Sequence, residues 1–142
     1  MLSLIPQPRE CDERLGTVMW TGLVGVATPH EWRDVVDTWC VKSSTASCTV
    51  TASEDVDVAR LVIRRDASLP SGGYRLVTDD VSEIVASDES GVLHALATLR
   101  QLGPPEWWRG GGVDGGTLEL AKVAVTDWPA FDWRGAHLDV AR

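Results

Sequence analysis

The sequence predicts an α+β fold, in which a mixed, mostly antiparallel sheet is covered on one face by two amphipathic helices. Two stripes of apolar residues at helical spacing predict the helices, and several short runs rich in Val, Leu and Ile predict the strands. The chain has 142 residues, of which 44% are hydrophobic. It is therefore long enough for one domain with an ordinary core.

The strands are expected between turn residues. Residues 2–10 should be extended because Pro6 and Pro8 disfavour a helix, and residues 17–27 should form a strand that bends at Gly22 or Gly25. Further strands are expected at 58–64, 74–78, 81–86, 118–126 and 136–140. The second and third of these are close enough to form a hairpin.

The first helix is predicted from its start signal and its periodicity. Thr28, Pro29 and Glu31 have the spacing of a capping box, with Thr28 at the N-cap. The apolar stripe that follows consists of Trp32, Val35, Val36, Trp39 and Cys40. A polar loop is expected over residues 43–47.

The second helix is predicted to follow Asp88. Its apolar stripe consists of Val92, Leu93, Leu96, Leu99 and Leu102. Gly103 and the two prolines after it end the helix, and residues 103–117 are expected to be a connector.

Charge and cysteine content exclude several classes of function. The net charge of −8 is unsuited to nucleic acid or an anionic membrane, which proteins bind with clustered Lys and Arg. Cys11, Cys40 and Cys48 have neither disulfide-framework nor metal-ligand spacing, which favours free thiols in a reducing compartment. No signal peptide is visible at the N-terminus, so a cytoplasmic protein is favoured, with secretion open if a leader was trimmed.

No catalytic, metal or cofactor site is expected from the polar residues alone. The glycines of 110–116 precede a strand rather than a helix, and His30, His94 and His137 lie far apart. Nothing in their spacing distinguishes the acids that could serve a glycosidase: Glu83, Asp88, Glu89, Asp127, Asp132 and Asp139. Trp32 and Trp39 are expected in the core, whereas the remaining loop and C-terminal tryptophans are open to core, interface or ligand roles: Trp107, Trp108, Trp128 and Trp133.

Residues 73–76 read Gly-Tyr-Arg-Leu, and the predicted helix of residues 91–102 carries Ala95, Thr98, Leu99, Gln101 and Leu102. These linked motifs resemble those of glycoside hydrolase family 20, the β-N-acetylhexosaminidases. Residues 4–8 resemble the family's opening segment. Residues 127–142 are similar to the run that enters the family's catalytic barrel as its first strand. Ala130, His94 and Ala97 depart from the usual Arg, aromatic residue and Gln.

The resemblance implies a non-catalytic N-terminal domain (zincin-like in fold) over residues 1–126 and a linker with the first strand of a truncated (β/α)8 barrel over residues 127–142. It implies that Arg134 binds the terminal sugar in the intact enzyme, that N-acetylglucosamine- or N-acetylgalactosamine-terminated glycans are substrates, and that the domain contacts its own catalytic domain. The chemistry would be substrate-assisted and retaining, with an adjacent Asp-Glu pair. Asp88-Glu89 and the Glu-Asp pair at 54–55 lie in the wrong domain, so no catalytic residue is assigned here and this chain is expected to be inactive.

Two alternatives stay open. One is a stand-alone carbohydrate-binding or accessory module that uses the loop tryptophans. The other is the similar N-terminal domain that precedes the barrel of O-GlcNAc hydrolases and α-glucuronidases, against which the segment from Trp133 to Arg142 argues.

Overall fold

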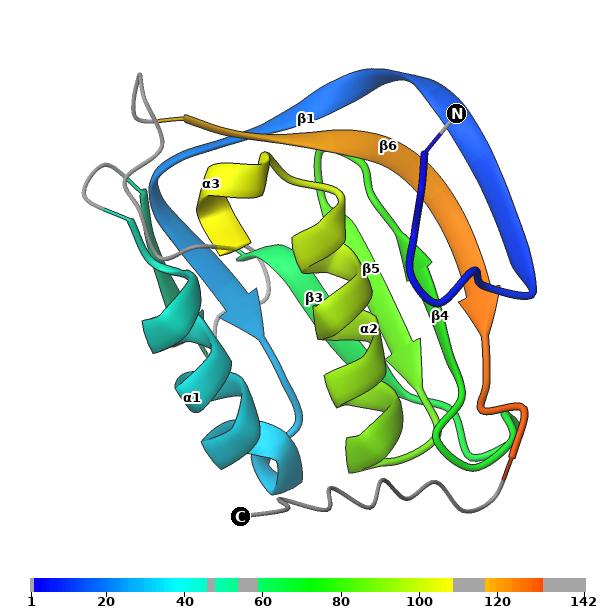
Figure 1. Cartoon of the computed structure of the whole chain (residues 1–142). Helices are drawn as coiled ribbons and strands as arrows, with labels where there is room; N and C mark the ends of the chain where they lie inside the picture. Colours follow the sequence, from blue (N-terminus) through cyan, green and yellow to red (C-terminus); the bar gives the residue numbers. More distant parts are fainter. Residues whose placement is uncertain (1, 46–47, 54–58, 109–116, 132–142) are drawn as a thin grey trace, which may run out of the picture.

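A computed structural model describes residues 2–45, 48–53, 59–108 and 117–131. Within these residues the chain forms one six-stranded sheet, with its helices on a single face (Figure 1). The strands are β1 (Glu10–Ala27), β2 (Cys48–Ser53), β3 (Ala59–Arg65), β4 (Tyr74–Val77), β5 (Ser82–Ala86) and β6 (Thr117–Asp127). The helices are the 3-10 turn η1 (His30–Trp32) and the α-helices α1 (Arg33–Ser43), α2 (Glu89–Gln101) and α3 (Pro105–Trp108). The predicted α+β class, with two main helices on one face, is confirmed.

The sheet is mixed, as predicted, and has the strand order β2-β1-β3-β5-β4-β6. β1 pairs in parallel with β2 and β3, and β3 pairs in parallel with β5. β4 is antiparallel to both β5 and β6. The longest pairing is also antiparallel and joins β1 to β6, which arch together across the top of Figure 1. The predicted hairpin is β4 and β5.

β1 pairs with different strands along its length. Its first part, from Glu10 to Thr21, pairs with β6, and its second part, from Gly22 onward, pairs with β2 and β3. Gly22 has a φ of +62°, a conformation that favours glycine, at the point where the partners change. The predicted bend therefore exists, although the strand begins at Glu10 rather than at residue 17.

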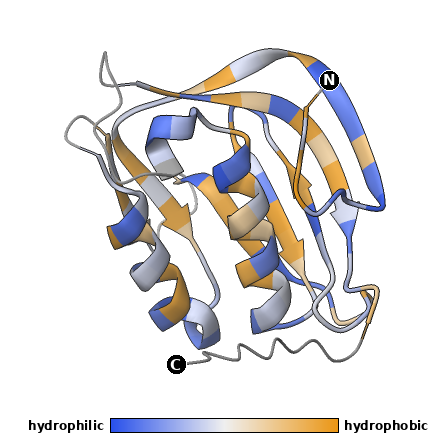
Figure 2. Ribbon diagram, viewed as in Figure 1, coloured by the Kyte–Doolittle hydropathy of each residue, from blue (hydrophilic) through white to orange (hydrophobic). Residues whose placement is uncertain are grey.

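The core lies between the sheet and the helices, where buried apolar residues of the strands, α1 and α2 form one cluster. Figure 2 shows the hydropathy of these elements along the ribbon. The first predicted stripe is confirmed, with Val35 partly buried and the other members buried. The second is wrong in one member: Leu93 is 45% exposed, whereas Val92, Leu96, Leu99 and Leu102 are buried.

The predicted capping box before α1 is wrong. Pro29 stands at the N-cap of η1, and no side chain caps that turn. The Thr28 hydroxyl donates to the carbonyl of Pro29 instead, at 3.4 Å. Glu31 is turned to the sheet, where its carboxylate lies 3.0 Å from the Arg65 guanidinium. The tight 3-10 turn explains the failure, because it places the Glu31 side chain away from the helix start.

Asp88 begins α2 as predicted. Its Oδ1 accepts the N–H of Gly91 at 2.9 Å, and its Oδ2 accepts the Gly72 N–H at 2.9 Å and the Ser71 hydroxyl at 3.0 Å. Burial opposes the charged form of this carboxyl, but the donors from Gly72, Gly91 and Ser71 outweigh it and lower the Asp88 pKa. One side chain thus joins the start of α2 to the turn before β4.

Two elements were missed by the sequence analysis, β2 and α3. β2 alternates buried Cys48 and Val50 with exposed Thr49 and Thr51, a short pattern that a flanking polar loop obscures. α3 lies in the predicted connector and carries Trp107.

Trp107 is 1% exposed, so the structure places it in the core, one of the roles that the sequence leaves open. Its ring packs edge-on against Trp20 and Trp39, with centroids 6.4 and 6.2 Å away. Its Nε1 donates to the carbonyl of Ser43 at 2.8 Å, which satisfies a carbonyl at the end of α1. Trp107 therefore connects β1, α1 and α3.

Replacing Trp107 tests this connection. Trp107→Ala should lower the free energy of unfolding by about 3–5 kcal/mol, the range for emptying a buried aromatic site. Trp107→Phe should cost about 1–3 kcal/mol, because it leaves the buried Ser43 carbonyl without a donor. Urea unfolding of the 142-residue chain measures both. Val41→Ala, at a position 78% exposed on α1, is the control and should change stability by less than about 0.5 kcal/mol. A Trp107→Ala effect as small as the control's would contradict this packing.

Removing the Asp88 carboxylate should destabilise the chain in a pH-dependent way. Asp88→Ala should cost about 0.5–2 kcal/mol at pH 7, as for other N-cap residues. Because the folded-state pKa is lowered, the stabilisation is complete above the unfolded-state value of about 3.9 and is lost as the pH falls through the folded-state value. Urea unfolding from pH 7 down to about pH 2.5 should therefore show the wild-type advantage shrinking. Glu89→Ala removes the neighbouring exposed acid as a control, and an Asp88→Ala effect that stays constant with pH would refute the charged cap.

Candidate functional site

The predicted substrate-binding residue, Arg134, lies outside the described residues. The described residues nearest to it in sequence are those after β6, from Trp128 to Phe131. This exit segment would set the direction of the following chain, so its contacts define the candidate site.

Arg9 fixes the first part of the exit segment. Its backbone N–H donates to Asp127 Oδ1 at 3.2 Å, and its Nε donates to the carbonyl of Trp128 at 3.4 Å. The guanidinium carbon lies 4.4 Å from the centroid of the Trp128 ring, a cation–π contact worth about 0.5–1 kcal/mol at exposed sites. The segment before β1 is thereby joined to the segment after β6.

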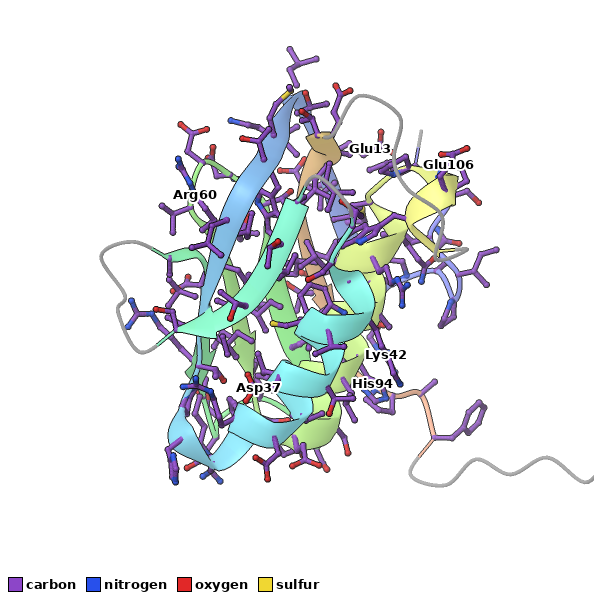
Figure 3. All side chains as sticks on the ribbon, turned by 90° about the vertical axis from the view of Figure 1, so that its left-hand side faces the viewer. Glu13, Asp37, Lys42, Arg60, His94 and Glu106 are labelled. Atoms are coloured by element: carbon purple, nitrogen blue, oxygen red, sulfur yellow. The ribbon has the colours of Figure 1, made fainter. Side chains whose placement is uncertain are left out.

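Gly72 lies against the second part of the exit segment, and His94 binds Gly72 beside it. Gly72 has a φ of +68°, and a Cβ there would lie 2.9 Å from Pro129 Cγ and 3.3 Å from His94 Cε1. The Nδ1 of His94 lies 2.9 Å from the Gly72 carbonyl oxygen, so the tautomer that carries the Nδ1 hydrogen donates to it. Figure 3 labels His94, which projects from α2 toward the chain after β6. We call Arg9, Gly72, His94, Trp128 and Pro129 the exit cluster.

The motif residues of the sequence hold the framework around the exit cluster. The Gln101 side chain forms two hydrogen bonds with the backbone of Ile5. Gln101 Nε2 donates to the Ile5 carbonyl at 2.9 Å, and Gln101 Oε1 accepts the Ile5 N–H at 2.8 Å. The Tyr74 hydroxyl lies 2.6 Å from the Thr98 hydroxyl, and burial raises the Tyr74 pKa to about 12. A Cβ on Gly91 would overlap the carbonyl oxygen of Gly73, so α2 and the turn before β4 meet closely there. These contacts pack α2 against the N-terminal segment, β4 and the turn before β4.

Two hollows adjoin the exit cluster. A pocket of about 120 Å³ lies among Ile5, Tyr74, His94, Gln101 and Trp128. It is smaller than the roughly 300–1,000 Å³ of typical ligand pockets. The second is an open groove of about 720 Å³, which we call the exit groove, lined by Arg9, Pro70, Ser71, Gly72, Ser90, His94 and the residues from Trp128 to Phe131.

The candidate acids that the structure describes have separate partners and do not form a catalytic pair. The Glu83 carboxylate lies 2.9 Å from Arg64, Asp88 caps α2, and Asp127 accepts the Arg9 N–H. Glu89 is exposed in the first turn of α2. Asp132, Asp139 and the Glu-Asp pair at 54–55 lie outside the described residues. The described acids therefore have structural or solvent-facing positions.

In the described ranges, no group of three or more His, Cys, Asp and Glu could hold a metal ion. His137, Trp133 and the glycines of 110–116 lie outside those ranges. No helix among the described residues is long and apolar enough to cross a membrane.

The thiols are poor nucleophiles. Cys40 and Cys48 are buried and Cys11 is exposed, and all three are free. Burial, together with the nearby Asp37, raises the Cys40 pKa to about 12. Burial is also the main cause that raises the pKa of Cys11 and Cys48, so none of the three is activated.

Relatives with the same sequence pattern and fold are hexosaminidases. The chain is 30% identical over 142 residues to a beta-hexosaminidase from Vibrio furnissii, covering 99% of this chain and 22% of that protein. It is 34% identical over 86 residues to a beta-N-acetylhexosaminidase from Cellulomonas fimi, covering 60% of this chain and 16% of that protein. The chain thus spans about a fifth of the length of these relatives.

Solved structures show the same fold. A family 20 exo beta-N-acetylglucosaminidase from Vibrio harveyi, in complex with N-acetylglucosamine, matches 91% of this chain and 19% of that one, with a TM-score of 0.75 at 22% identity. A family 20 beta-N-acetylhexosaminidase from Streptomyces coelicolor matches 89% of this chain and 26% of that one, with a TM-score of 0.71 at 21% identity.

Residues 1–128 match glycosyl hydrolase family 20, domain 2. The chain covers 22% of the Vibrio furnissii protein and 16% of the Cellulomonas fimi protein, so the match concerns this domain alone. The sequence motifs and the fold agree with that assignment, and the chain belongs to glycosyl hydrolase family 20 through its domain 2.

Proposed function

We propose that this chain is the non-catalytic N-terminal domain of a β-N-acetylhexosaminidase whose catalytic barrel follows it. Membership of the family supports the proposal, as do relatives that bear this activity in their names. The proposed substrates of the whole protein are glycans that end in N-acetylglucosamine or N-acetylgalactosamine. The barrel would remove that terminal sugar with retention of configuration, using the 2-acetamido oxygen of the substrate as nucleophile in place of an enzyme carboxylate.

The proposed boundary divides residues 1–126 from residues 127–142. The end of β6 at Asp127 supports it, because the chain leaves the sheet there and enters the exit cluster. Arg134 would follow within a few residues and bind hydroxyls of the terminal sugar, for which its planar guanidinium fork is suited.

The domain's proposed role is to hold the start of the barrel in place. The exit segment is attached at several points, through the Arg9 contacts with Asp127 and Trp128 and the packing of Pro129 on Gly72. A displacement of about 1 Å in a binding group can cost a large factor in rate. A firmly held first strand would thus serve catalysis although the domain supplies no catalytic group.

The rival function, a carbohydrate-binding module, has one observation in its favour. The exit groove is large enough for a sugar and contains Trp128 and Phe131. However, the Arg9 guanidinium covers one face of the Trp128 ring, the kind of surface on which a sugar would stack. The scaffolding role is therefore the better supported of the two.

The first test is activity. The native-length gene product should release nitrophenol from an aryl N-acetyl-β-glucosaminide, and the 142-residue chain should not, because the described acids form no catalytic pair. Activity in the short chain would mean that the chemistry has been placed in the wrong domain. Inactivity of both, with binding of chitin oligomers by the short chain, would favour the accessory module.

Arg134 provides a second test. In the native-length protein, Arg134→Ala should lower kcat/KM about 10- to 100-fold, since hydrogen bonds to a charged group are worth about 1.5–3 kcal/mol. Arg64→Ala is the matched control, because Arg64 lies on the solvent face of the sheet, paired with Glu83. Equal activity of the two variants would remove Arg134 from the substrate site.

A further inference from the structure

Among the described strands, β2 alone has a single partner. It pairs with β1, whereas each of the other strands pairs with at least two neighbours. The free side of such a strand carries backbone N–H and C=O groups that point away from the sheet, and these groups can pair with a strand of another chain. The free side of β2 is therefore a potential pairing surface.

Charge protects the other one-sided part of the described sheet. The first part of β1 pairs with β6, and it carries the exposed residues Glu10, Asp12, Glu13 and Arg14. Its register against β6 also shifts between Glu13 and Thr17. Charged side chains and irregular register are two ways in which proteins keep edge strands from pairing with one another.

β2 has neither of these protections. Residues 48–53 contain no charged side chain and no proline, and their register with β1 runs without a shift from Cys48 to Ser53. Strands that are regular, uncharged and free of proline lack the features that deter strand pairing. An antiparallel copy of the same segment would meet no charge repulsion, and two-fold symmetry would bring the same side of both strands together. A second copy of this chain is thus the partner that this side fits.

Two residues that follow α1 occupy the free side of β2 instead. The Val50 N–H donates to Ser44 Oγ at 2.9 Å, and the Val50 carbonyl oxygen lies 3.2 Å from the same hydroxyl. The Cys48 N–H donates to Thr45 Oγ1 at 3.1 Å, and the Cys48 carbonyl accepts the Thr45 N–H at 2.8 Å. Because Cys48 and Val50 are alternate residues of one strand, their backbone groups lie on the same side. Both residues are therefore satisfied without a further strand.

Ser44 is also fixed to the end of α1. Its backbone N–H donates to the Cys40 carbonyl at 3.0 Å, and its hydroxyl lies 3.0 Å from the same carbonyl. The hydroxyl has one hydrogen, which it can donate to the Cys40 or to the Val50 carbonyl, whereas its oxygen accepts the Val50 N–H in both cases. The helix end thus holds the hydroxyl in place against the strand.

We propose that the free side of β2 is a latent pairing surface for a second copy of this chain, and that the hydroxyls of Ser44 and Thr45 keep it closed. Two copies would pair antiparallel through Cys48–Ser53, with the two Val50 residues opposite each other. Loss of the Ser44 hydroxyl leaves the Val50 backbone groups without this partner, and pairing with a second copy restores both hydrogen bonds. This inference goes beyond the proposed function and does not depend on it.

The experiment removes the two hydroxyls one at a time from the 142-residue chain. Ser44→Ala removes both contacts with the Val50 backbone. Thr45→Val removes the neighbouring hydroxyl and keeps the shape of the side chain, so it tests the same surface if Ser44→Ala does not fold. Ser44→Thr keeps a hydroxyl and is the conservative control. Thr38→Ala is the second control, because it removes an exposed hydroxyl that bonds a carbonyl within α1.

Sedimentation equilibrium over a series of concentrations measures self-association. We expect Ser44→Ala and Thr45→Val to lower the Kd of the dimer about tenfold, the order expected when a competing hydrogen bond is removed. Ser44→Thr and Thr38→Ala should associate no more than the wild type. Adding Thr49→Lys and Thr51→Lys to Ser44→Ala should abolish the gain, because exposed lysines of the two copies would then lie opposite each other.

Three results would overturn the proposal. Sedimentation of Ser44→Ala and Thr45→Val as the wild type would mean that the free side of β2 is not a pairing surface. Equal association of Ser44→Ala with and without the two lysines would place the contact between copies elsewhere. A wild-type dimer that Thr49→Lys and Thr51→Lys dissociate would show that the hydroxyls do not close this side.

Discussion

The structure depends on the double pairing of β1. One continuous strand pairs antiparallel with β6 and then in parallel with β2 and β3, and Gly22 lies where the partners change. β6 pairs with β4 as well as with β1. Each strand in the series β1-β3-β5-β4-β6 therefore pairs with the next, and the last strand pairs with the first. The sheet therefore curves around its helical face, and its first and last strands lie side by side.

The exit cluster follows from that pairing. Glu10 is opposite Thr126, so the residues just before β1 and just after β6 must be neighbours. Arg9 can then contact Asp127 and Trp128. On the other side of β6, Tyr74 is opposite Asp127, which places the turn before β4 beside the same exit segment. Backbone register, more than any one side chain, sets where the chain leaves the domain.

Sequence periodicity predicted most of the fold and little of the exit cluster. The stripe of α1, the Asp88 start of α2 and the β4–β5 hairpin are local patterns and were found. The contact of Trp107 with Trp20 and Trp39 joins residues far apart in sequence, and no local signal reveals it. The capping-box prediction was wrong because residues 30–32 form a 3-10 turn before α1 begins. Leu93 was assigned to the core because periodicity shows that a residue belongs to an apolar stripe and not how far the sheet covers the edge of that stripe; Leu93 is 45% exposed.

The residues that carried the family resemblance take part in close contacts, which explains why the domain is recognisable from its sequence. The hydroxyls of Tyr74 and Thr98 form a hydrogen bond, and the Gln101 side chain forms two with the backbone of Ile5. Gly91 has no side chain, which leaves room for the carbonyl of Gly73. Each contact joins α2 to the turn before β4, to β4 itself or to the N-terminal segment, and these elements surround the exit cluster. Their geometry tolerates little change, since a larger residue at Gly91 collides with backbone. For the proposed task of holding one chain segment in one direction, such close contacts matter as reactive groups matter to an active site.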